Sequence, residues 1–526
     1  MNIRTFVPTI SMSLIAKSLL LASGVVTTAL LILSYVGVSS LGMMDFLFLF
    51  LMSTLAAAYR PGWAFLLLVS VLPLEIVNLA PTAIGSAIRP YQFLMITIYA
   101  GLAVRLFAQR PLLGWPRLHI GDLFVFLIPI GAVFAIPNAV DRNVSLHLSV
   151  ILFSFVALYF LFRMYVRTSA DVGKILPFLI LSAVLTSVWS ISQNLLFLSG
   201  RESFEVMPGR PNGPFAEADW LGMFLGTACS ILITAGYLIA SRSTSIREYF
   251  RMKRSVYLFL GMTSLFVALI VTMSRSAWLG TAVSVLTAFL LIFISRRRQV
   301  GSILLMTIAS TGTLALLLVF AVPLTDFDIF GRAASIGSGL QSITVSCERK
   351  TALPDTVIST ESLALYGCRH IDLDEVDSER TAGRYVTEID RNDPNVSIRR
   401  RIYAHSVSLG FEHPIQGIGW GSITAFLGQD GRGAGLNASN IFLETWLGSG
   451  LLGLVGLTGF LIVLAYRSVR DFVMFRGAFS FFMVSSFAGI ITFNLFNSGI
   501  LLGFFWALLG IAGSYLFHES DFSETL

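Results

Sequence analysis

The side chains that could do chemistry stand in short polar stretches between long apolar segments of the chain. Arginine is informative here, because its planar guanidinium grips phosphate oxygens through two parallel hydrogen bonds. A histidine or a carboxylate nearby could take a proton from a hydroxyl group. Such a set would suit a transfer reaction with a diphosphate leaving group, because the departing negative charge needs nearby cations. The residues of these types are Arg210, Glu217, Asp219, Ser274, Arg275, Arg399, Arg400, Arg401, His405, Glu412, His413, Ser439 and Asn440.

The apolar segments place the chain among membrane proteins. Its 526 residues are 55% hydrophobic and 13% charged, whereas soluble domains carry about twice that charged fraction. Runs of about 20 apolar residues recur, each long enough to cross a bilayer as a helix. We therefore predict an all-α polytopic membrane protein with about 12–14 transmembrane helices. The expected segments are 14–36, 42–58, 61–80, 90–108, 120–137, 145–166, 173–199, 217–240, 254–273, 276–294, 300–323, 441–466, 475–496 and 498–517.

The cationic residues set the orientation of these spans. With the N-terminus in the cytoplasm, nearly every cluster of Lys and Arg falls on one side, as the positive-inside rule requires. Both termini are then cytoplasmic, and the net charge of +6 reflects these loops and no nucleic-acid partner. The apolar run 18–36 is too long for a signal-peptide core, so we expect it to remain as the first span. The cytoplasmic clusters are Arg105, Arg110 and Arg117; Arg163, Arg167 and Lys174; Arg242, Arg247, Arg251, Lys253 and Arg254; Arg296, Arg297 and Arg298; and Arg467, Arg470 and Arg476.

The same orientation puts four segments on the outer side: 200–216, the turn Ser274-Arg275, 324–440, and the turn near 494–497. Only the third of these has the composition of a soluble segment. We therefore divide the chain into N-terminal membrane helices with about 11 spans, a large extracytoplasmic segment, and about 3 C-terminal spans. The corresponding ranges are 1–323, 324–440 and 441–526.

Two of the three cysteines, Cys347 and Cys368, lie in the extracytoplasmic segment. In an oxidising compartment this spacing suggests a disulfide, with two free thiols as the alternative. A metal site is disfavoured, because two cysteines do not supply four ligands. Acidic residues at 372–379 in the same segment are interpreted as a solvated surface, with a divalent-metal site as the minor alternative.

The outer arginines run against the positive-inside rule, so each needs a partner. Arg210 and Arg275 either cap the C-terminal carbonyls of a preceding helix or bind an anion. His413 precedes Pro414 and either braces a turn or takes part in catalysis. His405 lies four residues after Arg401 on an expected amphipathic helix, where it faces either a cavity or the bilayer surface.

Two glycine patterns and one helix start complete the outer region. The run Gly417-x-Gly419-x-Gly421 has no strand before it and no Lys after it, so we favour a turn over a phosphate loop. Gly450 and Gly453 are assigned to close packing of membrane helices. Ser439 or Asn440 should cap the helix that follows. The N-terminus of that helix would favour an anion through its free N–H groups and its dipole.

Four stretches resemble the O-antigen ligase and O-antigen polymerase superfamily of bacterial envelope glycosyltransferases. They are RPNGPFAEADWLGMFLG (210–226), TMSRSAWLG (272–280), RRIYAHSVSLGFEHPIQGIGWG (400–421) and SNIFLETWLGSGLLG (439–453). The last one follows the ligase pattern of His-Asn, nine residues and Gly-x-x-Gly. Asn440 and Gly450 keep that spacing, but Ser439 stands where ligases carry the histidine that is the presumed base.

The resemblance implies a GT-C-like membrane enzyme of the bacterial inner membrane with its active site facing the exterior. It would transfer a glycan from a polyprenyl-diphosphate carrier to a glycan or lipid-linked acceptor, in contact with membrane lipids. The missing histidine favours an O-antigen or exopolysaccharide polymerase over a lipid A-core ligase of lipopolysaccharide synthesis; a lipid-linked oligosaccharide flippase is the rival class. No cofactor is indicated, and the mechanism is expected to be metal-independent. We assign catalytic roles to Arg210, Arg275, His405, Glu412 and His413, and substrate-binding roles to Glu217, Arg400, Arg401, Ser439 and Asn440.

Overall fold

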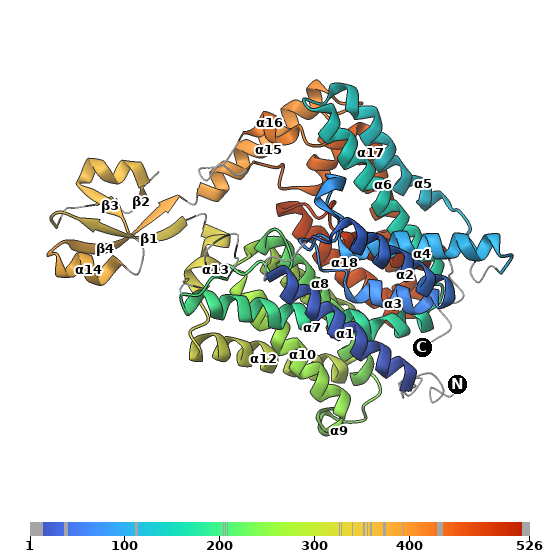
Figure 1. Cartoon of the computed structure of the whole chain (residues 1–526). Coiled ribbons are helices and arrows are strands. Elements are labelled where there is room, and N and C mark those ends of the chain that lie inside the picture. Colours follow the sequence, from blue (N-terminus) through green and yellow to red (C-terminus); the bar gives the residue numbers. More distant parts are fainter. Residues whose placement is uncertain are drawn as a thin grey trace. The chain divides into compact units, whose positions relative to one another are not determined.

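The computed structural model divides into two compact units (Figure 1). The first, here called the helical unit, contains residues 1–325 and 410–526, and the second, the inserted unit, contains residues 326–409. The structure describes residues 14–35, 40–110, 114–203, 205, 207, 209–325, 327, 329–338, 340–350, 353–354, 356–357, 360–371, 375–392, 394–428 and 435–517.

The helical unit is an all-α membrane bundle. Each of the fourteen apolar segments expected from the sequence contains one of its helices. Among the described residues, eleven helices are long and apolar enough to cross a membrane, and α2, α3 and α19 are shorter apolar helices. The helices are α1 (Leu14–Tyr35), α2 (Met43–Tyr59), α3 (Pro61–Ser70), α4 (Pro90–Phe107), α5 (Ile120–Ala135), α6 (Arg142–Tyr165), α7 (Ser169–Leu198), α8 (Ala218–Ala240), α9 (Ile246–Arg251), α10 (Lys253–Val271), α11 (Arg275–Ile294), α12 (Arg298–Ala321), α16 (Ile423–Leu427), α17 (Ile441–Phe475), α18 (Ala478–Phe496) and α19 (Gly503–Phe517).

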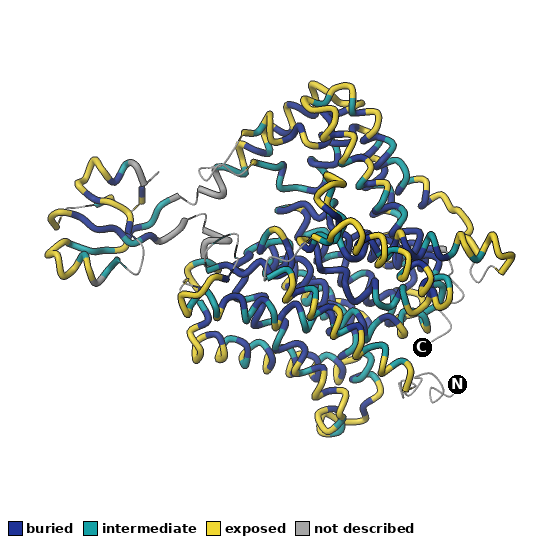
Figure 2. The backbone as a smooth tube through the Cα atoms, in the orientation of Figure 1, coloured by how far each residue is buried: buried dark blue, intermediate teal, exposed yellow. Residues whose placement is uncertain are grey.

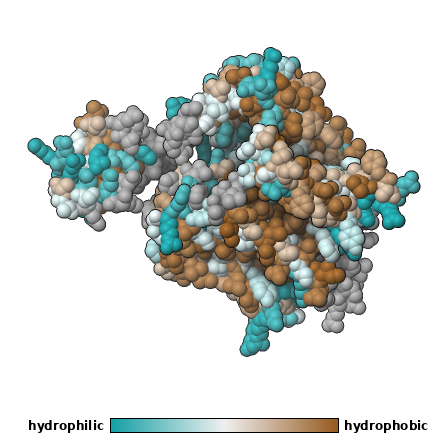
Figure 3. Space-filling model, in the orientation of Figure 1, coloured by the Kyte–Doolittle hydropathy of each residue, from teal (hydrophilic) through white to brown (hydrophobic). Residues whose placement is uncertain are grey.

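Large apolar side chains cover much of the surface of this bundle (Figure 3). On α2, for example, Leu47, Phe48 and Leu51 are all more than half exposed. A soluble monomer rarely exposes contiguous apolar surface on this scale. Figure 2 shows which stretches of the helices are buried, and a large cluster of apolar side chains occupies this interior. Helices that are hydrophobic on both faces belong in a lipid environment.

The third span is shorter than predicted. Helix α3 ends at Ser70, whereas the sequence suggested a helix over 61–80. Pro73 explains the early end, because proline has no N–H and disfavours helical geometry in the residue before it. The backbone after α3 is buried, and its amides form hydrogen bonds. Those of Glu75 and Ile76 both donate to the carbonyl of Pro214, at 3.0 and 3.1 Å. Non-helical backbone at this depth is tolerated only inside protein, as here.

Helix α17 is broken where a continuous span was expected. Gly450 has φ 62° and ψ −163° inside it. A side chain there would be strained and would also collide with the carbonyl oxygen of Ile415. That same oxygen accepts a hydrogen bond from the Leu451 amide at 3.0 Å. The first nine residues of α17 are therefore a separate helical segment, held at its end by the loop after α15.

Small residues let α5 pack closely against α17. A side chain at Gly131 of α5 would collide with Ser449, and one at Gly456 or Gly459 would meet Phe124. Membrane helices associate through such close approach, since lipid supplies no hydrophobic force between them. Gly456 and Gly459 therefore allow close packing against α5, and Gly453 lies against Gly131, whereas Gly450, also assigned to packing, serves the break.

The inserted unit contains a small sheet that the sequence did not lead us to expect. Its elements are α13 (Ile329–Ser338), β1 (Leu340–Cys347), β2 (Thr356–Val357), β3 (Cys368–His370), α14 (Val376–Thr381), β4 (Tyr385–Asn392) and most of α15 (Pro394–Glu412). The strand order is β2-β4-β1-β3. Strand β1 is antiparallel to β3 and β4, and β2 is parallel to β4. The signal was present as alternation in β1, where Ile343, Val345 and Cys347 are buried on one face.

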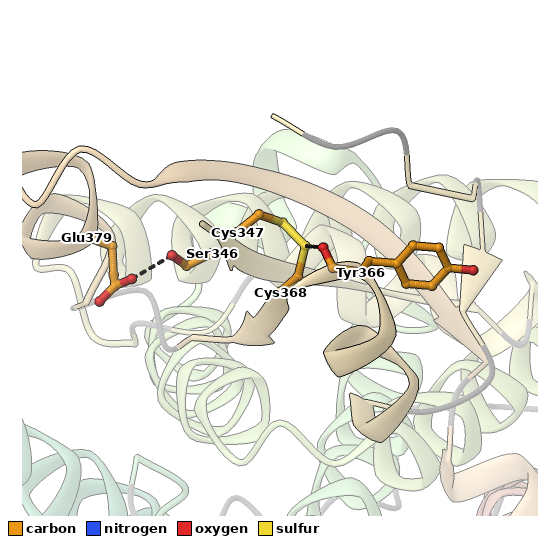
Figure 4. The surroundings of a disulfide bond; sticks show 5 residues. All are labelled: Ser346, Cys347, Tyr366, Cys368 and Glu379. Atoms are coloured by element: carbon orange, nitrogen blue, oxygen red, sulfur yellow. Dashed lines mark hydrogen bonds between the residues drawn. A yellow bond between two sulfur atoms is a disulfide. The ribbon is translucent and has the colours of Figure 1, made fainter. Parts of the chain in front are cut away.

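A disulfide joins Cys347 and Cys368, the pair expected from the sequence (Figure 4). The register of β1 and β3 places these two residues directly opposite each other. Beside them, the Ser346 hydroxyl donates to Glu379 at 2.5 Å. This hydrogen bond and the cation of Arg369 lower the pKa of the Glu379 carboxyl. Within the acidic run, Glu375 and Glu379 form ion pairs with Arg369, while Asp372 and Asp374 lie outside the described residues.

Candidate functional site

Ends of five helices of the helical unit meet in a group of polar side chains, which we call the polar end. They are the N-termini of α8, α11 and α17 and the C-termini of α10 and α18. Hydrogen bonds and close contacts between these ends, described below, hold the group together. Its members are Arg210, Glu217, Asp219, Thr272, Ser274, Arg275, Asn440, Glu444, Asn494, Asn497 and Ser498.

Arg210 ties three of these segments to one another. Its Nε donates to the carbonyl of Thr272 at the C-terminus of α10, at 3.0 Å. Its Nη2 forms an ion pair with Asp219 in the first turn of α8, at 3.3 Å. The residue is only 9% exposed. Of the two roles considered from the sequence, these contacts favour capping of a helix end.

The turn between α10 and α11 presents Arg275. Met273 lies in the left-handed region with φ 53°, and Ser274 caps α11 by accepting from the Ala277 amide at 3.3 Å. Gly222 of α8 allows the close approach, since a side chain there would collide with Ala277. Arg275 is the first residue of α11 and is partly exposed. A cation at a helix N-terminus adds to the positive potential of the free N–H groups, so this position favours an anion.

Asn440 caps α17, as expected. Its Oδ1 accepts from the amides of Phe442 and Leu443 at 3.0 and 3.2 Å, and its Nδ2 donates to the Leu495 carbonyl of α18 at 3.2 Å. Ser439 has φ 47°, and its hydroxyl donates to Asn437 at 2.8 Å. The hydroxyl of Ser439 therefore supports the turn that leads into the helix.

Glu444 is the member of the polar end that sequence reasoning missed. It lies one helical turn after Asn440 and is 9% exposed. Its Oε2 is buried and has no hydrogen bond of ordinary length to a residue that the structure describes, although the Ser498 hydroxyl is near enough to interact with the carboxyl group. Glu217, the N-cap residue of α8, is close enough to interact with it electrostatically, and Ser498 lies beside it. A single carboxylate inside an apolar span was the available signal, because such residues are rare and functional.

A second carboxyl group that the sequence analysis missed lies in the loop before α8. The Oε2 of Glu205 accepts from the Gly209 amide at 2.9 Å, while its Oε1 is buried with no hydrogen bond to a described residue. Burial raises the pKa of Glu205 to about 7, against the opposing effect of the Gly209 amide. This carboxyl group stands five residues before Arg210 on the same loop.

The remaining site residues predicted from the sequence are elsewhere. Arg400, Arg401 and His405 lie on α15 within the inserted unit, and their side chains are exposed. Glu412 and His413 are exposed at the end of α15, in the helical unit. The carbonyl of His413 accepts from the Gly417 amide at 2.9 Å, which favours the turn-bracing role.

The run from Gly417 to Gly421 is a turn packed on the broken helix. All three of its glycines have positive φ, at 74°, 81° and 83°. The buried Trp420 donates through Nε1 to Ser449 at 2.8 Å, and the Ile418 amide donates to Leu447 at 2.8 Å. The predicted turn and the Gly450 stretch are therefore one structural unit that fixes the first segment of α17. Among the described residues, no three His, Cys, Asp or Glu side chains are grouped so that they could hold a metal ion.

Residues 260–458 match a family model described as O-antigen ligase. Over these residues the chain is similar to the domain of that family. This domain begins within α10 and ends within α17, so it includes Arg275, Ser439, Asn440 and Glu444. It confirms the resemblance to the O-antigen ligase and polymerase superfamily, whose members are membrane enzymes of the glycosyltransferase type. No curated protein matches the chain.

Proposed function

We propose that this O-antigen ligase domain protein is an extracytoplasmic glycosyltransferase that polymerises surface polysaccharide repeat units. The donor is a glycan linked to a polyprenyl diphosphate, and the acceptor is a sugar hydroxyl. The observation that carries the proposal is Arg275 at the N-terminus of α11, inside the matched domain. A guanidinium and the positive end of the helix dipole there would stabilise the negative charge that develops on the departing diphosphate.

The contacts of two residues near Arg275 suit this role. Arg210 and Asp219 hold the end of α10 and the start of α8 together, so the turn that presents Arg275 is fixed. A charge-stabilising group acts most strongly when it needs no rearrangement in the transition state. Arg210 therefore serves as a positioning residue, and Arg275 as the residue that would touch the diphosphate.

Polymerisation is favoured over transfer to lipid A-core by one position. Ser439 stands where the ligases carry histidine, and its hydroxyl is engaged with Asn437. A serine hydroxyl does not take a proton at neutral pH without a partner base. Ligation to lipid A-core remains the alternative within the same family.

An outer location of the polar end follows from the cationic loops, which lie at the opposite ends of the same helices. Arg242 and Arg254, for example, follow α8 and begin α10, while Arg210 and Arg275 lie at the other ends. The positive-inside rule thus supports the proposal that the reaction takes place at the outer face of the bacterial inner membrane, with both termini inside. Reporter fusions after residues 205, 370 and 297 should report outside, outside and inside; a cytoplasmic 370 would contradict the proposal.

A transporter is disfavoured by where the buried charges lie. The buried ion pair of Asp122 and Arg163 joins the start of α5 to the end of α6, and so is not near the middle of a span. Transporters typically keep their charged sites near the midplane.

Purified protein in proteoliposomes tests the function. Supplied with a polyprenyl-diphosphate-linked repeat unit, it should release polyprenyl diphosphate and form longer lipid-linked glycans. If glycan product forms only when lipid A-core is added, the protein is a ligase and not a polymerase. Movement of the donor across the bilayer with no new glycosidic bond would overturn the enzyme proposal in favour of a flippase.

A further inference from the structure

The position of Glu444 raises a question that packing does not answer. Its carboxyl group is nine-tenths buried, and its Oε2 receives no hydrogen bond from the described residues. Leaving a buried polar atom without a partner is costly, and more so for a charged one. Its place in the first turn of α17, where the helix dipole favours an anion, offsets part of this cost. The Ser498 hydroxyl interacts with the carboxyl group but lies too far for an ordinary hydrogen bond, so Oε2 can still accept one from a ligand.

Glu217 adds a second carboxyl group to the first. It is the N-cap residue of α8 and interacts electrostatically with Glu444. Two neighbouring carboxylates repel each other when both are ionised. Asp219, two residues further on, forms the ion pair with Arg210. The carboxyl pair thus belongs to the same polar end as the arginine that fixes the Arg275 turn.

We propose that Glu444 is the general base of the transfer reaction, with Glu217 as the group that adjusts its charge. This inference rests on the proposed function. The acceptor hydroxyl gives its proton to the Glu444 carboxylate while its oxygen forms a bond to the anomeric carbon of the donor glycan. The bond from that carbon to the diphosphate oxygen breaks, and the electron pair leaves with the polyprenyl diphosphate. Glu444 thereby supplies the base that Ser439 does not.

The geometry of α17 places the proposed base close to the entrance of the helix. Ser439 and Asn440 form the entrance of α17, and Glu444 follows one turn later on the side that approaches Glu217. The break at Gly450 and the turn around Trp420 fix this first segment. A base must be held within hydrogen-bond reach of the hydroxyl that it deprotonates, and the rigid segment provides such a fixed position.

The test compares three variants of the full-length protein in proteoliposomes. Glu444→Gln keeps the volume but cannot accept the proton, so the initial rate per molecule should fall by about 10²–10⁴. Glu444→Asp keeps a carboxylate and should retain part of the rate with a displaced pH profile. Glu202→Gln, at an exposed glutamate between α7 and α8, is the control and should match the parent protein. The acid limb of the pH–rate profile should disappear in the residual activity of Glu444→Gln.

A labelling experiment gives a second readout that does not depend on turnover. Dicyclohexylcarbodiimide reacts with protonated carboxyl groups in apolar surroundings, and mass spectrometry locates the adduct. We expect Glu444 to be labelled at low pH and to be protected by undecaprenyl diphosphate. If undecaprenyl diphosphate leaves the labelling of Glu444 unchanged, the inference is contradicted. This test uses the parent protein, so it remains valid if the Glu444→Gln variant fails to accumulate.

The outcomes separate the two proposals. If the parent protein makes polymer and Glu444→Gln does so at a near-normal rate with an unchanged pH profile, the base assignment fails and the glycosyltransferase stands. If the parent protein transfers no glycan from any diphosphate-linked donor, the proposed function itself fails.

Discussion

Two buried glutamates in the helical unit, Glu75 and Glu444, have the same chemistry and opposite surroundings. They are 6% and 9% exposed. Glu75 has both oxygens occupied: Oε1 accepts from the Gly503 amide at 2.7 Å, and Oε2 lies 3.0 Å from both Tyr91 and Arg89. Glu444 has a like-charged neighbour and an oxygen with no donor among the described residues. Burial alone therefore does not tell a structural carboxylate from a functional one; its partners do.

The Glu75 cluster has an evident structural purpose. It joins the non-helical segment after α3 to the start of α4, through Arg89 and Tyr91, and to the start of α19, through Gly503. The early end of α3 leaves that segment without helical hydrogen bonds, and these contacts fix it. Glu444 makes no such hydrogen bonds of ordinary length through its Oε2 to the segments that the structure describes.

The largest effect that sharpens this comparison is expected for Glu75→Gln. It leaves Arg89 without its ion partner, and breaking a buried pair in this way costs about 3–5 kcal/mol. Protein abundance and thermal stability in detergent should fall, while glycan product per surviving molecule stays near normal. Glu444→Gln should show the reverse pattern. A loss of specific activity in Glu75→Gln at unchanged stability would break the distinction between the two glutamates.

The two arginines of the polar end also differ in the way the two glutamates do, one being structural and the other functional. Arg210 is buried and bonded to Thr272 and Asp219, whereas Arg275 is partly exposed at the start of α11. Arg275→Ala should slow the transfer by about 10²–10³, and Arg275→Lys should also be impaired because it lacks the fork of the guanidinium. Arg210→Ala should instead lower stability first. If both Arg275 variants form near-normal product per molecule but accumulate to a lower level, Arg275 has a structural role and not a catalytic one.

The disulfide tests stability apart from the polar end, because it lies in the inserted unit. Replacing Cys347 and Cys368 together with serine removes a crosslink across 21 residues. The inserted unit should lose about 3 kcal/mol of stability, measured as increased hydrogen exchange in β1 and β4. Exchange in α8 and α17 should not change. Labelling of both cysteines by a thiol reagent in native membranes, before reduction, would show that the crosslink is absent.

The smallest effect concerns the loop that carries Arg210. Burial raises the pKa of Glu205 to about 7 from an ordinary 4.5, so the folded loop binds a proton that the unfolded loop releases. The loop should be most stable below pH 4.5 and should lose stability as the pH rises through 7. The group is half exposed, so solvent screening keeps the change below about 1 kcal/mol.

Hydrogen exchange of the Gly209 amide, corrected for its intrinsic pH dependence, measures this change. Protection should be lower at pH 8 than at pH 5, and the difference should vanish in Glu205→Gln. Equal protection at both pH values in the parent protein would contradict the assignment.

The features predicted from the sequence were the local ones. Apolar length located all fourteen helical segments, residue type limited the cap of α17 to Ser439 or Asn440, and the cysteine pair was identified by its compartment. The helix breaks at Pro73 and Gly450 were missed, because apolar composition continues through both. The Gly450 break depends on the carbonyl of Ile415, thirty-five residues earlier in the chain, and no local pattern encodes that contact.

Glu444 was missed for a related reason. Hydropathy is averaged over a window, and one carboxylate among Ile441, Phe442, Leu443 and Trp446 hardly changes the average. Its neighbour Glu217 belongs to a different helix. Only the tertiary structure places the two carboxyl groups together and shows which oxygen lacks a donor.

The broken helix also limits how the length of this chain can vary. The Leu451 amide donates to the Ile415 carbonyl, and the Ile418 amide donates to the Leu447 carbonyl. The loop 415–421 and the broken part of α17 are therefore held in a fixed register. One residue inserted or deleted between 415 and 421 would shift every glycine of the turn out of its positive-φ position and move Trp420 away from Gly448. Loops usually tolerate insertions and deletions, but the loop 415–421 should tolerate neither. In an alignment of homologous chains, gaps should therefore fall outside this loop.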